Sequence, residues 1–363
     1  MEITVLDKDL KLVDIIDNFD SLQWIRRYYK EGKFELHCPV NFKNINALAK
    51  DNYIWKDNSN EIGIIEQRNL FIDTDGTEKI KINGRFFTSI LDRRSMIGTE
   101  RYINKEFETI MRNLVYKNCI NVSANRKLPI LLGDINNFSI RGNYEKSYGE
   151  VLEELSKLSE VSNIGFYIRT DLANKKHYFE TYKGLDRSVN QQENSHVVFS
   201  RDEDNLYEQE YEDSNKELKT TAIVAGEGEG TARTVITVNN DFKGLERREL
   251  FVDARDLQKE SQEEGSIPLT DEEYKEILIQ RGFEKLNEHK EIQAFEGKIN
   301  SDNYVYKKDY DLGDIVTVMD KAWNIVVNTR ITEINEVYEG KDVEIVPVLG
   351  DTNPSILDKL KRK

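Results

Sequence analysis

The residues best able to do chemistry are scattered along this 363-residue chain without a catalytic or ligand spacing. The sequence contains no GxSxG or HExxH motif. Cys38 and Cys119 are too few for a disulfide framework, and we interpret them as two buried thiols. The histidines share no HxH or HxxxH spacing, so no structural zinc site is expected. They are His37, His177, His196 and His289.

Two further patterns resemble functional sites but have simpler interpretations. The GEGEG run at residues 226–230 looks like a phosphate loop, but its glutamates would repel a phosphate and a strand pattern follows it. We predict a hairpin tip there. The adjacent carboxylates of Glu153 and Glu154 could be read as an acid–base pair. They lie where a helix is expected to start, and negative side chains there interact favourably with the helix dipole. With 67 Asp and Glu, no glycosidase pair can be chosen. The sequence therefore predicts no enzyme, and no catalytic, cofactor-binding or metal-binding residue.

The composition narrows the class of protein. Asp and Glu (67) exceed Lys and Arg (52), giving a net charge of −15 at pH 7. This argues against a duplex-binding protein, which needs a basic surface to release counterions. The 38% hydrophobic content, with 17 Tyr and 15 Phe, is sufficient for packed cores. The N-terminus lacks a secretory signal pattern, and no apolar run approaches the ~18 residues of a membrane span, so we expect a soluble protein without a membrane partner.

The clearest β pattern runs from residue 309 to 351 and predicts three successive strands. Gly313 and Asp314 form the turn into the first strand. Pro347 lies within the last strand, which indicates an edge position because proline cannot donate to a ladder. Near the N-terminus, short strands are predicted within 3–16 and at 34–38. A hairpin is predicted around a turn at 73–76.

The remaining elements are mixed. We predict a helix capped by Thr99 from about Glu100 to Lys117, and a second helix around residues 151–158. Strands are predicted at 165–168, 178–182, 197–199, 206–211, 220–225, 234–238 and 292–299. Thr270 and Glu273 form a capping box for a helix that ends near His289. A short charged helix is expected after residues 353–354.

These elements predict an α+β fold that is mainly β, with two related β-barrel-like domains and an α+β domain between them. The expected boundaries are 1–98, 99–215 and 216–352, with a helical insertion at about 265–290 and a tail at 353–363. The hairpins at 62–84 and 329–350 have similar layouts, each ending on a glycine (Gly84 and Gly350). They are either two copies of one module or two unrelated hairpins. If they are copies, they should superimpose, and a trimer of the chain would present six similar β modules around an axis.

A family resemblance rests on the two ends of the chain. SLQWIRRYYKEGKFELHCP (21–39) resembles the first β domain of the siphophage tail-hub (Gp37-like) family, which is akin to the central baseplate hub of contractile tails. YDLGDIVTVMD (310–320) and NTRITEINEVYEGKDVEIVPVLG (328–350) are similar to that family's closing β domain. The resemblance implies a homotrimer in which two β domains per chain form a pseudo-sixfold ring. This ring would join the hexameric tail tube to the trimeric tip or spike.

The resemblance also implies partners and a location. We expect contacts with tail tube and spike proteins, and with wedge or tape-measure proteins, in a virion or phage-tail-like particle (a phage, a bacteriocin or another contractile injection system) assembled in the bacterial cytoplasm. DNA would be passing cargo in an acidic lumen. A separate polypeptide would supply the tip. No cofactor is expected. The candidate fold- and ring-forming residues are Trp24, Arg26, Arg27, Tyr28, Gly84, Gly313, Asp314, Pro347 and Gly350.

Three alternatives remain at this point. The Arg26-Arg27-Tyr28-Tyr29 run could be a nucleic-acid patch, although on an acidic chain a packing and interface role is the stronger interpretation. The protein could be a cell-wall or polysaccharide hydrolase at a tail tip, or a receptor-binding adhesin. The missing catalytic constellation argues against a hydrolase, and the missing fibre repeats argue against an adhesin.

Overall fold

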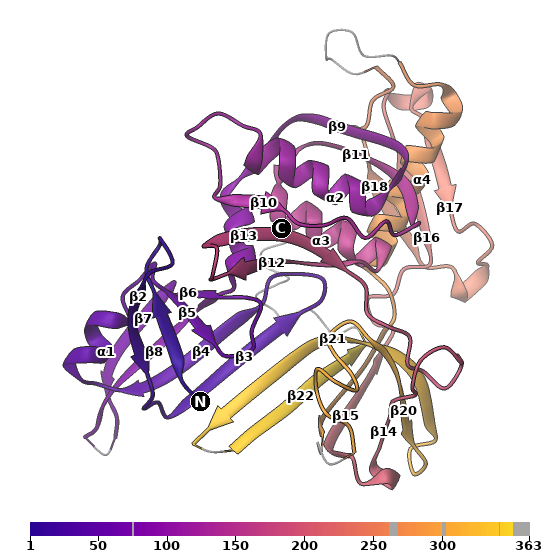
Figure 1. The fold of residues 1–363 in the computed structure, drawn as a ribbon. Helices are drawn as coiled ribbons and strands as arrows, with labels where there is room; N and C mark the ends of the chain where they lie inside the picture. The colour runs from indigo at the N-terminus through magenta and orange to yellow at the C-terminus, as the bar shows by residue number, and fades with distance from the viewer. Residues whose placement is uncertain (75, 261–267, 300–302, 341, 351–363) are drawn as a thin grey trace.

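The computed structural model describes residues 1–363 except 75, 261–267, 300–302, 341 and 351–363 (Figure 1). Over these described residues the fold is mainly β with four α-helices, and the predicted α+β class with two β modules around a mixed unit is confirmed. The C-terminal helix expected after residue 353 lies outside the described residues. No helix in the described part of the chain is long and apolar enough to cross a membrane.

The N-terminal β module has two layers. Strands β3 (Ser21–Arg27), β4 (Lys33–Pro39), β8 (Glu78–Arg85) and β7 (Gln67–Ile72) are neighbours in that order, and we call them the first quartet. The second layer is the sheet β2-β1-β5-β6 with helix α1 (Phe42–Ala47). Its strands are β1 (Ile3–Leu6), β2 (Leu12–Ile16), β5 (Tyr53–Lys56) and β6 (Gly63–Ile64). Alternating apolar residues from both layers, including Leu22, Trp24 and Ile54, fill the core between them.

A middle unit follows, and its core is continuous with residues of the N-terminal module such as Ile64 and Phe87. Its elements are β9 (Ser95–Glu106), α2 (Phe107–Val115), β10 (Ile130–Leu132), β11 (Arg141–Glu150), α3 (Val151–Ser162), β12 (Gly165–Asp171) and β13 (Lys176–Tyr182). Strand β9 pairs with β11, and β10-β13-β12 form a separate sheet. The predicted strands at 165–168 and 178–182 are therefore confirmed.

The helix predicted from Glu100 was wrong over its first half. Residues 95–106 form β9, and α2 begins only at Phe107 with Glu106 in the N-cap position. Thr99 caps nothing; its hydroxyl hydrogen bonds to that of Ser147 on β11. The cause is the pairing of β9 with β11, a strand that the sequence pattern missed because RGNYEKSYGE has no β-branched residue. Tertiary pairing thus overrides a local helical period.

The C-terminal β module contains a second quartet, β15 (Leu206–Ser214), β19 (Ile292–Ile299), β22 (Asp342–Gly350) and β21 (Ile325–Glu339), in that order. The 15-residue β21 bends out of this quartet at its start. There its first residues pair with β20 (Ile315–Asp320), which pairs in turn with β14 (Val198–Ser200). The three strands predicted between residues 309 and 351 are confirmed as β20, β21 and β22.

An insert separates β15 from β19. It consists of the sheet β17-β16-β18 and helix α4 (Asp271–Asn287), with its own core. The strands are β16 (Thr221–Ala225), β17 (Val235–Val238) and β18 (Glu249–Asp253). The predicted capping box is confirmed, because Thr270 and Glu273 bond each other's backbone N–H. The GEGEG run connects β16 to β17, as the predicted hairpin tip.

The strand pairing bears on the proposed domain boundaries. Strands β14 and β15, which fall inside the predicted 99–215 domain, pair with β20 and β19 of the C-terminal module. Strands β16 and β17, predicted as part of the second β-barrel-like domain, form a separate sheet against α4. The division into domains remains a proposal, and these pairings favour a boundary before residue 198 and an insert from about 221 to 287.

Candidate functional site

The groups best suited to chemistry are buried structural groups. Cys38 and Cys119 are buried and unpaired, and burial raises the pKa of each thiol to about 12, which leaves no thiolate near neutral pH. His177 stacks on Phe87 and hydrogen bonds to Thr170, and burial lowers its pKa to about 4. Within the described residues, no group of three His, Cys, Asp or Glu side chains is arranged to hold a metal ion.

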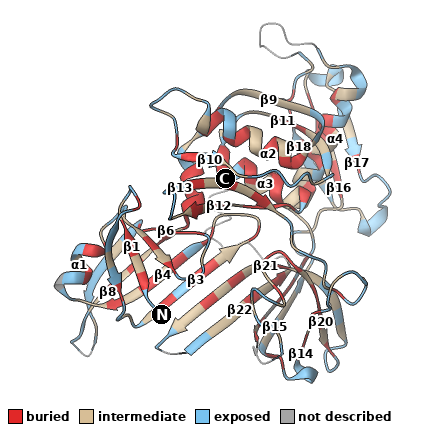
Figure 2. Cartoon of the chain, in the orientation of Figure 1, coloured by how far each residue is buried: buried red, intermediate tan, exposed pale blue. Residues whose placement is uncertain are grey.

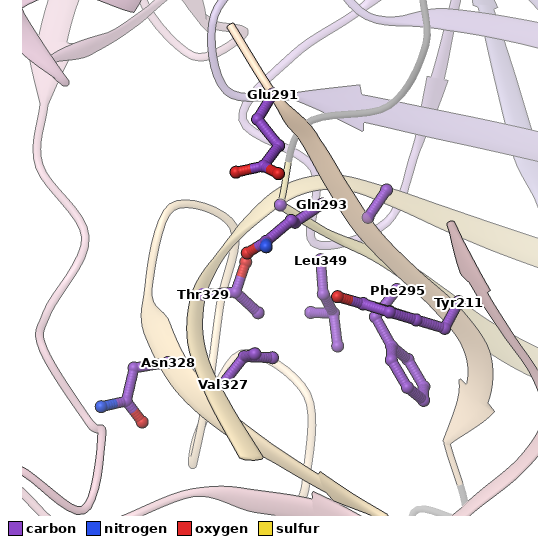
Figure 3. A pocket seen from close by; sticks show the side chains of 10 residues that line it. Tyr211, Glu291, Gln293, Phe295, Val327, Asn328, Thr329 and Leu349 are labelled. Carbon is purple, nitrogen blue, oxygen red and sulfur yellow. The ribbon is translucent and has the colours of Figure 1, made fainter. Parts of the chain in front are cut away.

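A pocket of about 230 Å³ lies where β15, β19, β22 and β21 meet (Figure 3). Glu291 is the one carboxylate among its described lining residues, and it lies at the rim beside Gln293 and Thr329. Phe295 and Leu349 are among its apolar lining residues. A glycosidase needs two facing carboxylates, so this lining offers no such pair.

The strand order of the large sheet repeats. The sequence of neighbours is β15-β19-β22-β21-β3-β4-β8-β7, and each neighbouring pair is antiparallel. In each quartet, the first two strands in the sheet are also the first two in the chain (β15 and β19, or β3 and β4). A later hairpin supplies the other two strands. The second strand of that hairpin (β22 or β8) pairs with the earlier strands, and its first strand (β21 or β7) ends the quartet. Hairpin β21-β22 thus occupies in the second quartet the place that β7-β8 occupies in the first. This is the pair of hairpins in which the sequence suggested a repeat.

The two terminal glycines are not equivalent, however. Gly84 lies on the buried face of β8 with Ile80 and Ile82, and a Cβ there would lie 1.8 Å from the Ile64 carbonyl oxygen. Gly350 lies on the opposite face from the buried Leu349, has φ +87° and approaches the Gln293 carbonyl oxygen. Each glycine permits a close backbone contact, but with different partners. The sheet order, rather than the glycines, relates the hairpins.

The quartets join where β21 pairs with β3, and we call this contact the junction. The ladder runs from Glu333 opposite Arg27 to Glu339 opposite Ser21. Arg27 Nε lies 2.6 Å from Glu333 Oε2 on the polar face of the sheet. Figure 2 shows buried and less buried residues alternating along β3 and β21. One face of the junction therefore belongs to the core, and the other is open.

A buried ionic cluster occupies the core face of the junction. Lys56 Nζ of β5 lies 2.6 Å from Glu336 Oε2 of β21, and their side chains are 3% and 2% exposed. Tyr338 donates to the same carboxylate oxygen at 2.6 Å, and Tyr306 donates to the other at 3.0 Å. Burial acts to raise the pKa of Glu336, but Lys56 and Lys307 hold it below its usual range. Glu336 is therefore a fully paired buried anion.

Arg26 and Glu61 extend this cluster. Arg26 donates to Asp311 at 2.6 Å and to Tyr306 at 2.7 Å. Glu61 is 8% exposed, and burial raises its pKa to about 7 although Arg26 and Lys307 act in the opposite direction. The cluster thus links four parts of the chain, and its direct bonds join residues up to 285 positions apart.

Three predicted residues meet at a second contact, between β3, the middle unit and the turn before β20. Gly313 has φ +93°, and a Cβ there would lie 2.3 Å from the Tyr28 ring. Tyr28 donates to the Asn163 carbonyl oxygen at 2.9 Å. The Asp314 carboxylate accepts from Arg187 Nε at 2.8 Å and from the Leu185 backbone N–H at 2.7 Å. This corner fixes the middle unit to the C-terminal module.

The other predicted residues lie elsewhere. Trp24 is fully buried in the N-terminal core, with its ring 4.4 Å from that of Phe86. Pro347 pairs with Ile334 of β21, and the ladder of β22 with β19 ends at Val348 in the part of the chain that the structure describes. Sequence reasoning missed the cluster residues Lys56, Glu61, Tyr306 and Glu336. The one available signal was Glu336 between Ile334 and Tyr338 on a single strand face, because a charged residue on a core face needs a partner, but it does not indicate which residue the partner is.

The polar faces of the two quartets differ in charge. Strand alternation places Lys33, Lys79, Lys81, Arg85 and Arg27 on the polar face of the first quartet, with Glu35. The same face of the second quartet carries Glu210, Glu212, Glu333, Glu339, Asp342 and Glu344, with Lys298. Some cations are paired within the quartet, such as Lys81 with Glu35 at 2.7 Å. One half of the face is nevertheless mainly basic and the other mainly acidic.

Comparison with known proteins gives a consistent assignment. The family model for the Siphovirus ReqiPepy6 Gp37-like protein matches residues 2–351. A tail protein from Neisseria meningitidis MC58 matches with a TM-score of 0.58 and 11% identity over 96% of both chains. Prophage tail protein gp18 from Listeria monocytogenes EGD-e matches with a TM-score of 0.56 and 13% identity over 99% of this chain and 98% of that one.

The 43 kDa tail protein of prophage MuSo2 from Shewanella oneidensis also shares the fold, with a TM-score of 0.55 and 12% identity over 96% of this chain and 98% of that one. Comparison with curated protein sequences gave no match. At these identities the structural likenesses show the fold alone, whereas the family model covers nearly the whole chain.

Proposed function

Because the chain belongs to the Siphovirus ReqiPepy6 Gp37-like protein family, we propose that it is the structural hub of a phage tail. Three copies would form a pseudo-sixfold ring that joins the tail tube to the tip or spike. Tube and spike proteins are the expected partners, with wedge or tape-measure proteins around them. The particle would be a virion or tail-like particle assembled in the bacterial cytoplasm, and the protein would act by assembly rather than by catalysis.

The observation that carries this proposal is the repeated strand order. Two quartets with the same order and the same strand directions lie edge to edge in one sheet. A chain that repeats one module twice can present six similar modules as a trimer, which matches a sixfold partner on one side and a threefold partner on the other. The three tail proteins that share the fold over nearly their whole length support the same role.

The polar face of the quartets is the proposed lining of the ring. It differs from the uniformly acidic lumen expected from the net charge, because the first quartet contributes mainly basic strands. Around a ring the lining would alternate between basic and acidic sectors. Passing DNA would then meet no continuous positive surface, although the repulsion would be weaker than an acidic tube would give.

The proposal is tested by mass photometry and cryo-electron microscopy of the full chain, alone and with a tail tube protein from the same source. We expect a threefold particle with an axial opening. A chain that remains monomeric both alone and with the tube protein would contradict the hub role. Clearing of peptidoglycan by the purified chain, lost on substitution of a single carboxylate, would instead support a hydrolase.

A further inference from the structure

The pocket of about 230 Å³ in the C-terminal β module lies in a gap between strands. The described part of β22 ends at Gly350, which is opposite Ala294, whereas β19 extends past this pair to Ile292. The first residues of β21 pair with β20. Beyond Gly350, no strand of the described chain therefore lies between β19 and β21, and the pocket occupies this space.

We propose that this pocket binds one sugar ring of an uncharged glycan. The inference goes beyond the hub function and does not depend on it. It assigns binding and no reaction, because the described lining has a single carboxylate and glycoside hydrolysis needs two. The size of the pocket agrees with a small ligand, since sites for drug-sized molecules have volumes of about 300–1,000 Å³.

The first argument is that three polar side chains from three strands converge on the pocket. Tyr211 comes from β15, Gln293 from β19 and Thr329 from β21, and Figure 3 shows their hydroxyl and amide ends directed into one space. In the part of the chain that the structure describes, none of these three end groups makes a hydrogen bond. Hydroxyl and carboxamide groups both donate and accept, as the hydroxyl groups of a sugar do. The pocket thus offers matched partners that the fold does not use.

A fourth polar residue shows the contrast. The side chain of Asn328 points away from this space, and its Oδ1 accepts from the Thr317 hydroxyl at 2.6 Å (Figure 3). Its role is therefore within the fold. The groups of Tyr211, Gln293 and Thr329 have no such role in the described chain, which is typical of groups that orient a ligand.

The second argument is the apolar part of the lining. Phe295 and Leu349 are buried, and Val327 lines the pocket with them. The Tyr211 ring lies 6.1 Å from that of Phe295, so its aromatic surface continues this apolar part. A sugar presents C–H groups on the faces of its ring and hydroxyl groups at its edge. Apolar surface beside hydrogen-bonding groups matches both parts of such a ring.

The third argument is charge. Glu291 at the rim is the one charged residue of the described lining. Burial, Asp213 and Glu291 together raise the pKa of Tyr211, so the carboxylate acts on the phenol of the pocket. A carboxylate accepts hydrogen bonds from hydroxyl groups but repels phosphate and carboxylate groups. An uncharged glycan therefore fits this lining better than a phosphate-bearing polymer does.

Saturation-transfer difference NMR of the full chain tests the site. The probes are glucose, galactose, N-acetylglucosamine and rhamnose, with glycerol phosphate and N-acetyl-lysine amide for comparison. At the affinity per atom of small ligands, at least one of the four sugars should bind with a Kd of about 1–10 mM. Glycerol phosphate should show no transfer. Transfer to none of the four sugars would overturn the proposal. Transfer to the lysine compound alone would show a pocket for a peptide side chain and would also overturn it.

Variants locate the binding. Gln293→Ala removes an exposed amide, and Tyr211→Phe removes the hydroxyl but keeps the ring against Phe295. Loss of one hydrogen bond should raise the Kd of the bound sugar by about three- to tenfold in each variant. Tyr207→Phe and Gln23→Ala are matched controls, because both residues are exposed and lie outside the lining. They should bind like the wild type.

The outcomes of these variants are distinct from those of the hub test. Unchanged Kd values for Gln293→Ala and Tyr211→Phe, with far-ultraviolet circular dichroism unaltered, would place the sugar elsewhere and overturn the proposal. Equal losses in the pocket variants and their controls would show a nonspecific effect and overturn it as well. In either case, threefold assembly measured on the same protein would leave the hub role intact.

Discussion

The closed junction between β21 and β3 and the open edges at β7 and β15 occupy equivalent places in two repeats of one strand order. The core face of the closed junction holds an ionic cluster around Lys56 and Glu336, whereas the core face of β7 exposes the apolar Leu70 and Ile72. A buried ion pair requires its partners in one geometry, so it specifies the register of a permanent contact. An apolar edge is tolerated by a single copy, which leaves the side chains of Leu70 and Ile72 exposed. The difference separates a contact that closes when the chain folds from edges that stay exposed in the single copy.

The largest expected effect is the loss of the anion at the closed junction. Glu336→Ala leaves the 3% exposed Lys56 ammonium without its carboxylate. Removing one partner of a buried pair costs about 3–5 kcal/mol. Urea unfolding, followed by far-ultraviolet circular dichroism, should show this loss in the free energy of unfolding.

The matched control for this variant is Glu344→Ala. Glu344 is on the neighbouring strand β22 and its side chain is 43% exposed beside Lys298. Exposed pairs contribute about 0–1 kcal/mol. Similar losses for the two variants would show that the junction cluster has no special role in stability.

The junction also shows which features of the fold could be predicted from the sequence and which could not. The hairpins, the capping box of Thr270 and Glu273, and the turn at Gly313 depend on neighbours in the chain, and local patterns were sufficient for them. Lys56 and Glu336 are 280 positions apart. No local period indicates that one strand will meet the other, so the cluster could not be found.

Sheet membership was unpredictable for the same reason. The apolar runs of β16 and β17 predict strands correctly. Nothing in these runs indicates that the strands form a separate sheet against α4 instead of joining the sheet of β19 and β22. Residues 100–106 of β9 were predicted as helix because the partner strand β11 carries no strong strand signal. The repeated hairpins were visible as a hypothesis, since the similarity of 62–84 and 329–350 is a property of short segments. Their shared place in the sheet order required the structure.

A second prediction compares one residue type at the closed and open edges. Ile334→Ala should destabilise the chain by about 3 kcal/mol, since Ile334 is fully buried and truncation leaves a cavity. Ile72→Ala, at the 70% exposed position on β7, should change the free energy of unfolding by about 0.5 kcal/mol or less in the monomer. Chemical denaturation of both variants at a protein concentration below that of assembly measures the difference. Equal losses would mean that the β7 edge is already covered in the single copy.

A third prediction concerns pH. The pKa of Glu61 is raised by burial from 4.5 in the unfolded chain to about 7, so the folded protein holds an extra proton between these values. The contribution of Glu61 to the free energy of unfolding is therefore at its maximum below pH 4.5 and is lost as the pH rises through 7. The Glu61→Gln variant should not lose this stability at high pH, because glutamine does not ionise. Between pH 5 and pH 8, the stability of the variant relative to the wild type should rise by about 2–3 kcal/mol.

Thermal or urea unfolding at several pH values measures this change. Burial also raises the pKa of Glu284 on α4 to about 7, but this residue is the same in both proteins, so the difference between the two pH profiles reports Glu61. Parallel pH profiles for the Glu61→Gln variant and the wild type would show that Glu61 is ionised at no cost in the folded state.

The smallest expected effect is on the polar face of the junction. Arg27 and Glu333 lie 2.6 Å apart with side chains that are 19% and 26% exposed. A double-mutant cycle with Arg27→Met and Glu333→Gln should give a coupling free energy of about 0.5–1 kcal/mol at low ionic strength. The coupling should decrease in 1 M salt, where the Debye length is about 3 Å. If the coupling is zero at low salt, the Arg27–Glu333 pair does not stabilise the junction, and its stability rests on the ladder and on the buried cluster of the core face.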